Sequence, residues 1–265
     1  MSVVAEAFTI DADGMALEAA RWGKGASEIV LLHEGLGSVG LWRDFPARLA
    51  AATGSGIVAY SRAGYGQSAS VPLPRPLSYM HDEAREVLPR VLRAIGARRV
   101  ILLGHSDGAS IAAIHAAAPT DECAIAGLVL IAPHFFVEEV SITSIAAART
   151  AYQTGDLRAR LARHHRDVEA AFRGWNDAWL DPGFRTWRID SLLPAITAPV
   201  LIIQGAADEY GTLAQIAVAE AELPRPPRVE IIAGAGHAPQ FSHSERVVAA
   251  IRDFTAACFS APPQA

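Results

Sequence analysis

The chain has 265 residues, of which 51% are hydrophobic and 19% charged, as expected for a globular protein with a sizeable core. A formal net charge of −5 gives no reason to expect nucleic acid or an anionic membrane as partner. The N-terminus shows no signal-peptide pattern and no stretch is long and apolar enough to span a membrane, so we expect a cytoplasmic protein. Cys123 and Cys258 lie far apart and suggest no disulfide framework.

Strands and helices are expected to alternate along most of the chain. Residues 5–22 alternate in polarity around a turn at 11–14 and predict an antiparallel hairpin. Short apolar runs predict buried strands, and the longer periodic stretches between them predict helices. The expected elements are strand 29–32, helix 41–52, strand 57–60, helix 78–95, strand 100–103, helix 109–118, strand 128–131, strand 200–203, helix 212–221, strand 229–232 and helix 244–258. This order predicts an α/β fold with a mostly parallel central β-sheet and helices on both faces.

The alternation breaks between about residues 137 and 197. This stretch has helical periodicity, balanced charge and three tryptophans. We interpret it as a helical insertion rather than an independent domain. The prediction is a single domain, 1–265, with a core formed by 1–136 and 198–265 and a helical cap insertion of about 137–197.

One serine stands where a buried strand turns directly into a helix of small residues. The segment Gly104-His105-Ser106-Asp107-Gly108 has the G-x-S-x-G spacing. A turn this tight forces its central residue into a strained conformation, and a side chain at either glycine would collide with neighbouring elements. The strain would hold Ser106 Oγ clear of the backbone at a helix N-terminus, where N–H groups stabilise an anion. The spacing also occurs by chance in turns, but the order of strand, motif and helix favours a nucleophile.

Two later strands end in candidate partners for this serine. Reactive groups gather at the carboxyl ends of parallel strands, and there the sequence places Asp208 and then His237. Histidine titrates near neutrality, so His237 would take the proton of Ser106 and later protonate the leaving group. Asp208 would hold the other ring nitrogen and fix the tautomer. Glu209 is the alternative acid and His243 the alternative base.

These motifs resemble those of the α/β-hydrolase family, over about residues 5–257. The elbow around Ser106 is similar to that of small-molecule hydrolases of the family, including amino-acid-ester hydrolases that also carry an aspartate after the serine. The resemblance implies the order serine, acid, histidine and an oxyanion hole formed by the backbone N–H groups of Gly35 and Asp107. Glu34 stands where the family usually has a glycine, which is a departure from the family's pattern in this loop.

Four side chains are candidates for the substrate pocket, namely Glu34, Asp107, Trp175 and Trp179. Tryptophans more often belong to a core, but a cap above a catalytic serine needs an apolar lid. The two carboxylates would oppose a developing oxyanion unless something offsets their charge. They either pair internally, with Arg62 or with backbone N–H groups, or Asp107 binds the amine of a cationic substrate. The sequence leaves both open.

The sequence predicts a serine hydrolase that cleaves a small carboxylic ester or related acyl compound through an acyl-serine intermediate, with no cofactor and no metal. The same triad would also serve a C–C bond, lactone or amide hydrolase, and a non-catalytic ligand-binding member of the fold is a further alternative. The G-x-G-x-x-G spacing at 35–40 suggests an NAD(P) reductase, but that reductase needs a Tyr-x-x-x-Lys pair and Lys24 is the chain's one lysine. His164 and His165 lack metal-ligand spacing and are interpreted as solvated helix residues. The oligomeric state is not predicted.

Overall fold

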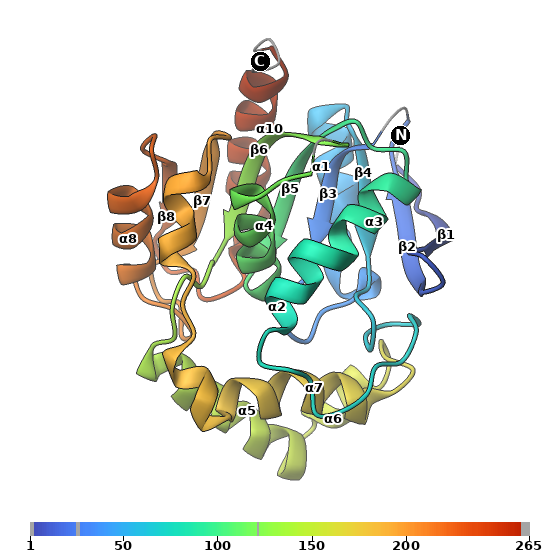
Figure 1. The fold of residues 1–265 in the computed structure, drawn as a ribbon, viewed down its shortest axis with the longest axis vertical. Coiled ribbons are helices and arrows are strands. Elements are labelled where there is room, and N and C mark those ends of the chain that lie inside the picture. The colour runs from blue at the N-terminus through green and yellow to red at the C-terminus, as the bar shows by residue number, and fades with distance from the viewer. Residues whose placement is uncertain (1–2, 25–26, 121, 261–265) are drawn as a thin grey trace.

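The structure is a computed structural model that describes residues 3–24, 27–120 and 122–260. The eight strands found in these residues form one sheet in the order β1-β2-β4-β3-β5-β6-β7-β8 (Figure 1). β2 pairs antiparallel with both of its neighbours, and every other pair is parallel. The strands are β1 (Glu6–Asp11), β2 (Ala16–Trp22), β3 (Ser27–Leu32), β4 (Gly56–Tyr60), β5 (Arg99–His105), β6 (Ala124–Ile131), β7 (Val200–Gly205) and β8 (Arg228–Ile232). The expected hairpin and mostly parallel sheet are confirmed.

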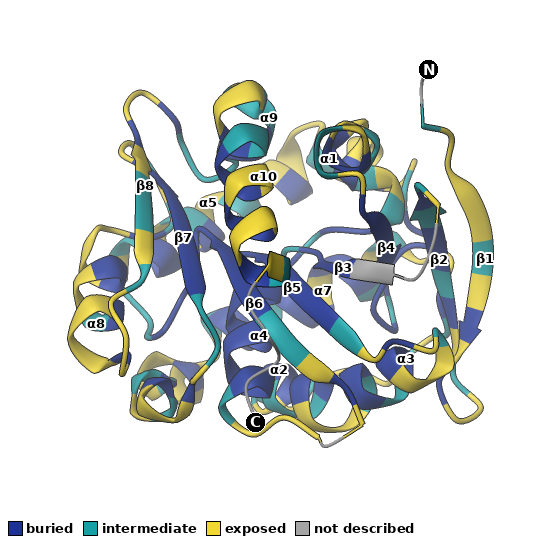
Figure 2. Ribbon diagram, turned by 90° about the horizontal axis from the view of Figure 1, so that it is seen from above, coloured by how far each residue is buried: buried dark blue, intermediate teal, exposed yellow. Residues whose placement is uncertain are grey.

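Side chains of the central strands alternate between two hydrophobic clusters, one on each face of the sheet. On β5, Val100 and Leu102 belong to one cluster, whereas Ile101 and Leu103 belong to the other. Both faces are covered by helices (Figure 2), which explains why these strands read as unbroken apolar runs. Helices α2 (Tyr79–Asp82), α3 (Leu88–Ala94), α4 (Asp107–Ala117) and α8 (Ala214–Glu222) cover one face, and α1 (Phe45–Thr53) and α10 (Ser244–Ser260) cover the other. Within the described ranges, no helix has the length and apolar character needed to cross a membrane.

The chain leaves the sheet between β6 and β7. This insertion forms α5 (Glu139–Thr154), α6 (Leu157–Leu161) and α7 (Val168–Leu180), followed by the 3₁₀ helices η3 (Pro182–Thr186) and η4 (Asp190–Ala195). Figure 1 shows α5, α6 and α7 lying together beyond one end of the sheet. The last part of the insertion returns to the helices that cover the sheet, because η4 packs on α4 and α8. The position of the insertion follows the expected break in the alternation.

The helix expected at 41–52 starts later than the sequence predicted. Residues Val39–Trp42 form a 3₁₀ turn, η1, and Arg43 then adopts a φ of 55°, which no helix can contain. The α-helix begins only after this kink, with Pro46 in its first turn, where its missing N–H costs nothing. The glycine spacing at 35–40 therefore leads into a single turn and does not open the long helix that a dinucleotide site requires.

The helix expected at 78–95 is present but changes its winding. Between α2 and α3 the residues Glu83–Val87 form a π-helical segment. Pro89 lies just beyond it and has no N–H to donate, so a regular α-helical turn would leave a carbonyl group without its partner. The wider π turn accommodates this proline without ending the helix.

Candidate active site

Ser106 lies at the sharp turn between β5 and α4. Its φ of 53° and ψ of −119° place a non-glycine residue in a strained region of backbone conformation. The two flanking glycines permit this turn by close approach. A Cβ on Gly104 would overlap the backbone of Gly108, and a Cβ on Gly108 would overlap the carbonyl group of Leu32. The geometry is that expected of an elbow that presents a nucleophile.

Hydrogen bonds on both sides fix the strained residue. The N–H of Ser106 donates to the carbonyl of Ile131 at the end of β6, at 2.9 Å. Its own carbonyl accepts from the N–H groups of Ala109, at 2.8 Å, and Ser110, at 3.1 Å, in the first turn of α4. The hydroxyl of Ser110 in turn donates to the carbonyl of His134 at 2.6 Å. The elbow is thus anchored to the neighbouring strand and to the loop that follows it.

The structure brings Asp208 and His237 together. His237 Nδ1 lies 2.9 Å from both carboxylate oxygens of Asp208. The carboxylate also accepts from the N–H of Tyr210 at 2.8 Å, the N–H of Gly211 at 3.2 Å and the amide of Gln204 at 2.8 Å. Burial acts to raise the pKa of Asp208, but His237 and the backbone donors outweigh it, so the net shift is downward. The aspartate is therefore held ionised and immobile beside the imidazole.

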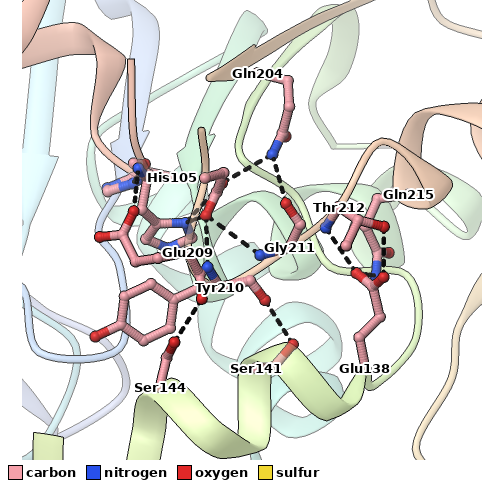
Figure 3. A network of polar contacts seen from close by, with 12 residues as sticks. His105, Glu138, Ser141, Ser144, Gln204, Glu209, Tyr210, Gly211, Thr212 and Gln215 are labelled. Atoms are coloured by element: carbon pink, nitrogen blue, oxygen red, sulfur yellow. Dashed lines mark hydrogen bonds and ion pairs between the residues drawn. The ribbon is translucent and has the colours of Figure 1, made fainter. Parts of the chain in front are cut away.

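The loop that follows β7 is also held from the insertion (Figure 3). On α5, Ser141 donates to the carbonyl of Tyr210 at 2.6 Å and Ser144 donates to the carbonyl of Glu209 at 2.5 Å. Glu209, the alternative acid, accepts from the backbone N–H of His237 at 3.1 Å and not from its ring. The geometry favours the neighbouring aspartate as the partner of the imidazole.

Ser106 and His237 line the same cavity, which has a volume of about 550 Å³ and lies between the carboxyl ends of the strands and the insertion. His243, the alternative base, does not line it, and its ring contacts Ser242 Oγ at 3.0 Å. All the other predicted oxyanion and pocket residues contribute to the wall, namely Gly35, Asp107, Glu34, Trp175 and Trp179.

The Asp107 side chain is buried and fully engaged by the protein. Its carboxylate accepts from the hydroxyl of Tyr79 at 2.6 Å and from the indole N–H of Trp179 at 3.2 Å, and Arg62 lies 4.0 Å away. Burial raises the pKa of Asp107, and the three partners only partly oppose the rise. Asp107 thus links the elbow to α2 and α7, which is the internal pairing that the sequence left open.

Glu34 is also paired internally, although not with the Arg62 side chain. Its carboxylate lies 3.7 Å from His105 Nδ1. Burial acts to raise the pKa of Glu34, but His105 outweighs it and the net shift is downward. The buried Arg62 guanidinium instead donates to the backbone carbonyls of His33 and, at 3.1 Å, Glu34. These two bonds fix the loop that carries Gly35.

His134 is a cavity residue that the sequence reasoning missed. It lies just past β6, so the same search of strand ends that found the acid and the base would have found it. Its ring is 5.2 Å from that of Trp179 and 5.8 Å from that of His237, and only 2% of the residue is exposed. Burial, reinforced by His237, lowers the pKa of His134 to about 3. The imidazole is therefore neutral at every ordinary pH.

The interpretation of His165 as a solvated helix residue was wrong. His165 is buried, its Nδ1 accepts from the N–H of Gly66 at 3.0 Å, and its Nε2 donates to the carbonyl of Leu36 at 3.0 Å. It ties the insertion to two loops of the sheet. His164 is half-buried and lines the cavity. In the part of the chain that the structure describes, no three His, Cys, Asp or Glu residues group as metal ligands would.

Comparisons with known proteins agree with this architecture. The profile of the alpha/beta hydrolase family matches residues 29–250. A curated relative from Mycobacterium tuberculosis, Esterase Rv0045c, is 24% identical over 261 residues, which cover 89% of this chain and 85% of the relative. The solved 2-hydroxy-6-oxo-6-phenylhexa-2,4-dienoate hydrolase of Rhodococcus sp. strain RHA1 aligns with a TM-score of 0.80 at 16% identity, over 98% of this chain and 100% of that one. Proline iminopeptidase of Mycobacterium smegmatis gives 0.73 at 19%, over 96% and 98%. The solved structures share the fold of this chain.

Proposed function

The chain belongs to the alpha/beta hydrolase family, and on that premise we propose that it is a serine hydrolase that cleaves a small carboxylic ester through an acyl-Ser106 intermediate. One observation carries the proposal. A strained serine at the start of a helix shares a cavity with His237, whose other ring nitrogen is held by Asp208. A serine and a histidine that line one cavity, with a carboxylate on the histidine, are the groups that acyl transfer requires.

The reaction would proceed in two steps, acylation of Ser106 and hydrolysis of the acyl-enzyme. His237 Nε2 removes the proton of Ser106 as Oγ attacks the ester carbonyl, and Asp208 stabilises the imidazolium that forms. The backbone N–H groups of Gly35 and Asp107 would receive the oxyanion. When the tetrahedral intermediate collapses, the C–O bond to the alcohol breaks and the imidazolium gives the alcohol its proton. Water then attacks the acyl-enzyme by the same steps and releases the acid.

The insertion would serve as a cap that covers the acyl group. Trp175 and Trp179 of α7, both buried, line the cavity from this side, and Leu157 and Leu161 of α6 add aliphatic surface. A Cβ on Gly35 would overlap the Trp175 indole, so this glycine lets the cap approach the expected oxyanion loop closely. Such apolar walls would limit the access of water to the reacting groups.

The choice of an ester as the bond cleaved rests on the curated relative, which is named an esterase. A C–C bond, lactone or amide hydrolase would use the same residues, and the two solved structures described above are named a dienoate hydrolase and an iminopeptidase rather than esterases. Turnover of an activated ester does not identify the natural bond type. A panel of unactivated esters, amides and diketones would identify it.

The nucleophile is tested by labelling with a fluorophosphonate and by hydrolysis of para-nitrophenyl pentanoate. Wild type should label, and Ser106→Ala should not, with kcat lower by roughly 10⁴-fold or more because the covalent intermediate is lost. Ser242→Ala, which removes an exposed hydroxyl, is the matched control. Equal labelling of wild type and Ser106→Ala would overturn the assignment.

A further inference from the structure

The cavity contains three carboxylates, and groups of the protein itself engage each of them. Glu34 faces His105 at 3.7 Å. Asp107 accepts two hydrogen bonds beneath the elbow and lies 4.0 Å from a guanidinium. Glu209 accepts from the backbone N–H of His237. A substrate amine would therefore have to displace a buried partner to reach Asp107.

The arginines of the cavity, in contrast, have weak partners or none. Arg160 and Arg163 line it from α6 and the turn that follows, and Arg43 lines it from the loop after η1. Arg160 faces Asp156 at 3.8 Å, but both side chains are mostly exposed, so the pair is weak. Arg43 rests on the ring of Phe241 at 4.6 Å. In the described residues, the Arg163 guanidinium has no hydrogen bond or ion pair.

Arg158 provides a comparison, because it is an arginine with a close carboxylate partner. Arg158 lies on the same helix as Arg160 and donates to Glu169 at 2.7 Å. It does not line the cavity. Helix α6 thus pairs one arginine with the partly exposed carboxylate of Glu169 and contributes another to the wall of the cavity that Ser106 also lines.

From this charge distribution we propose that the substrate is an anionic ester, one that carries a carboxylate away from the scissile bond. The inference rests on the proposed function and names its substrate class. Arginine donates two parallel N–H bonds that match a carboxylate in plane and spacing, so Arg160 and Arg163 suit this ligand. Arg43, which lies outside the insertion, adds a third positive charge to the electrostatic potential of the cavity. The apolar wall between these arginines and Ser106 takes the carbon chain.

The test compares esters that differ only in one charge. The mono-para-nitrophenyl ester of adipic acid is paired with the same ester of adipamic acid, in which a carboxamide replaces the carboxylate, because the longer chain slows attack of the carboxylate on its own ester. A second pair, para-carboxyphenyl and para-carbamoylphenyl pentanoate, moves the charge to the leaving group. Wild type should prefer the anionic member of at least one pair by about tenfold or more in kcat/KM, and added salt should reduce that preference.

The variants assign the preference to residues. Arg160→Gln/Arg163→Gln should reduce the preference to about threefold or less, because both forks are lost. Arg158→Gln, on the same helix but paired with Glu169, should retain it. If wild type cleaves both carboxamide esters and shows no preference in either pair, the inference is overturned while the proposed function stands.

A binding experiment without turnover covers the case in which wild type cleaves none of the test esters. Adipate is titrated into Ser106→Ala and followed by tryptophan fluorescence, since Trp175 and Trp179 line the cavity. Saturation that is weakened about fivefold or more by Arg160→Gln/Arg163→Gln supports the anion site even if no ester is cleaved. If no ester is cleaved, absence of saturation, or saturation that the double variant does not weaken, overturns the inference. Failure of fluorophosphonate labelling, in contrast, counts against the proposed function alone.

Discussion

The neutral His134 should make the stability of this protein fall in mild acid. In the folded chain burial holds its pKa at about 3, whereas the ordinary value is 6.5. A histidine whose folded pKa is depressed binds its proton more readily when unfolded, so its contribution is present above about pH 6.5 and is lost as the pH falls toward 3. Lowering the pH from about 7.5 to about 5.5 should therefore cost about 1.4 kcal/mol through this one group.

The assay is urea unfolding at the two pH values for wild type and His134→Gln. Other groups also titrate in this range, and burial lowers the pKa of His33 and His165 as well. The difference between the two proteins removes those contributions and any pH-independent cost of the substitution. His134→Gln should lose about 1.4 kcal/mol less than wild type on acidification. His243→Gln, at a half-buried surface position, controls for loss of an imidazole as such.

Equal losses in wild type and His134→Gln would refute the reasoning. They would mean that the His134 imidazole takes up its proton in the folded protein, so that the wall of the cavity beside His237 is wetter or more polar than its 2% exposure indicates.

Two further changes probe the contacts around the site. Asp208→Asn should lower kcat/KM for an activated ester by roughly 10³-fold or more, because an amide neither fixes the tautomer of His237 nor stabilises its cation. Glu209→Gln, which changes only a backbone contact, should cost about tenfold or less, and the reverse ranking would show that the acid was misassigned. His165→Phe should lower the free energy of unfolding by about 2 kcal/mol, because the N–H of Gly66 and the carbonyl of Leu36 are left without a partner. Urea unfolding checks the loss, and a stability equal to that of wild type would contradict it.

Local steric rules were enough to predict the elbow. Gly104 and Gly108 indicate that two backbone segments approach closely, and the structure shows that neither position has room for a Cβ. The parallel sheet was equally readable, since buried strands are apolar on both faces. These features depend on neighbours in sequence, which a single chain displays directly.

The missed features depend on contacts between distant parts of the chain. The sequence around His165 suggests a polar, exposed residue. Its burial depends on a hydrogen bond from Gly66, which lies 99 residues away in the sequence. The direction of Arg160 and Arg163 depends on how α6 sits against the sheet, which no local pattern encodes. Even the kink at Arg43 needs a positive φ at a residue type that seldom adopts one.

Among the contacts that join the insertion to the rest of the fold, those of three residues end beside different loops of the candidate site. Ser141 of α5 reaches the loop that bears the acid, Trp179 of α7 reaches Asp107 at the elbow, and His165 reaches the loops of Leu36 and Gly66. Exchanging the whole insertion with that of a relative would disturb all three loops at once. Helix α6 makes none of these contacts, so its replacement would change the arginine-bearing wall of the cavity and leave those loops anchored.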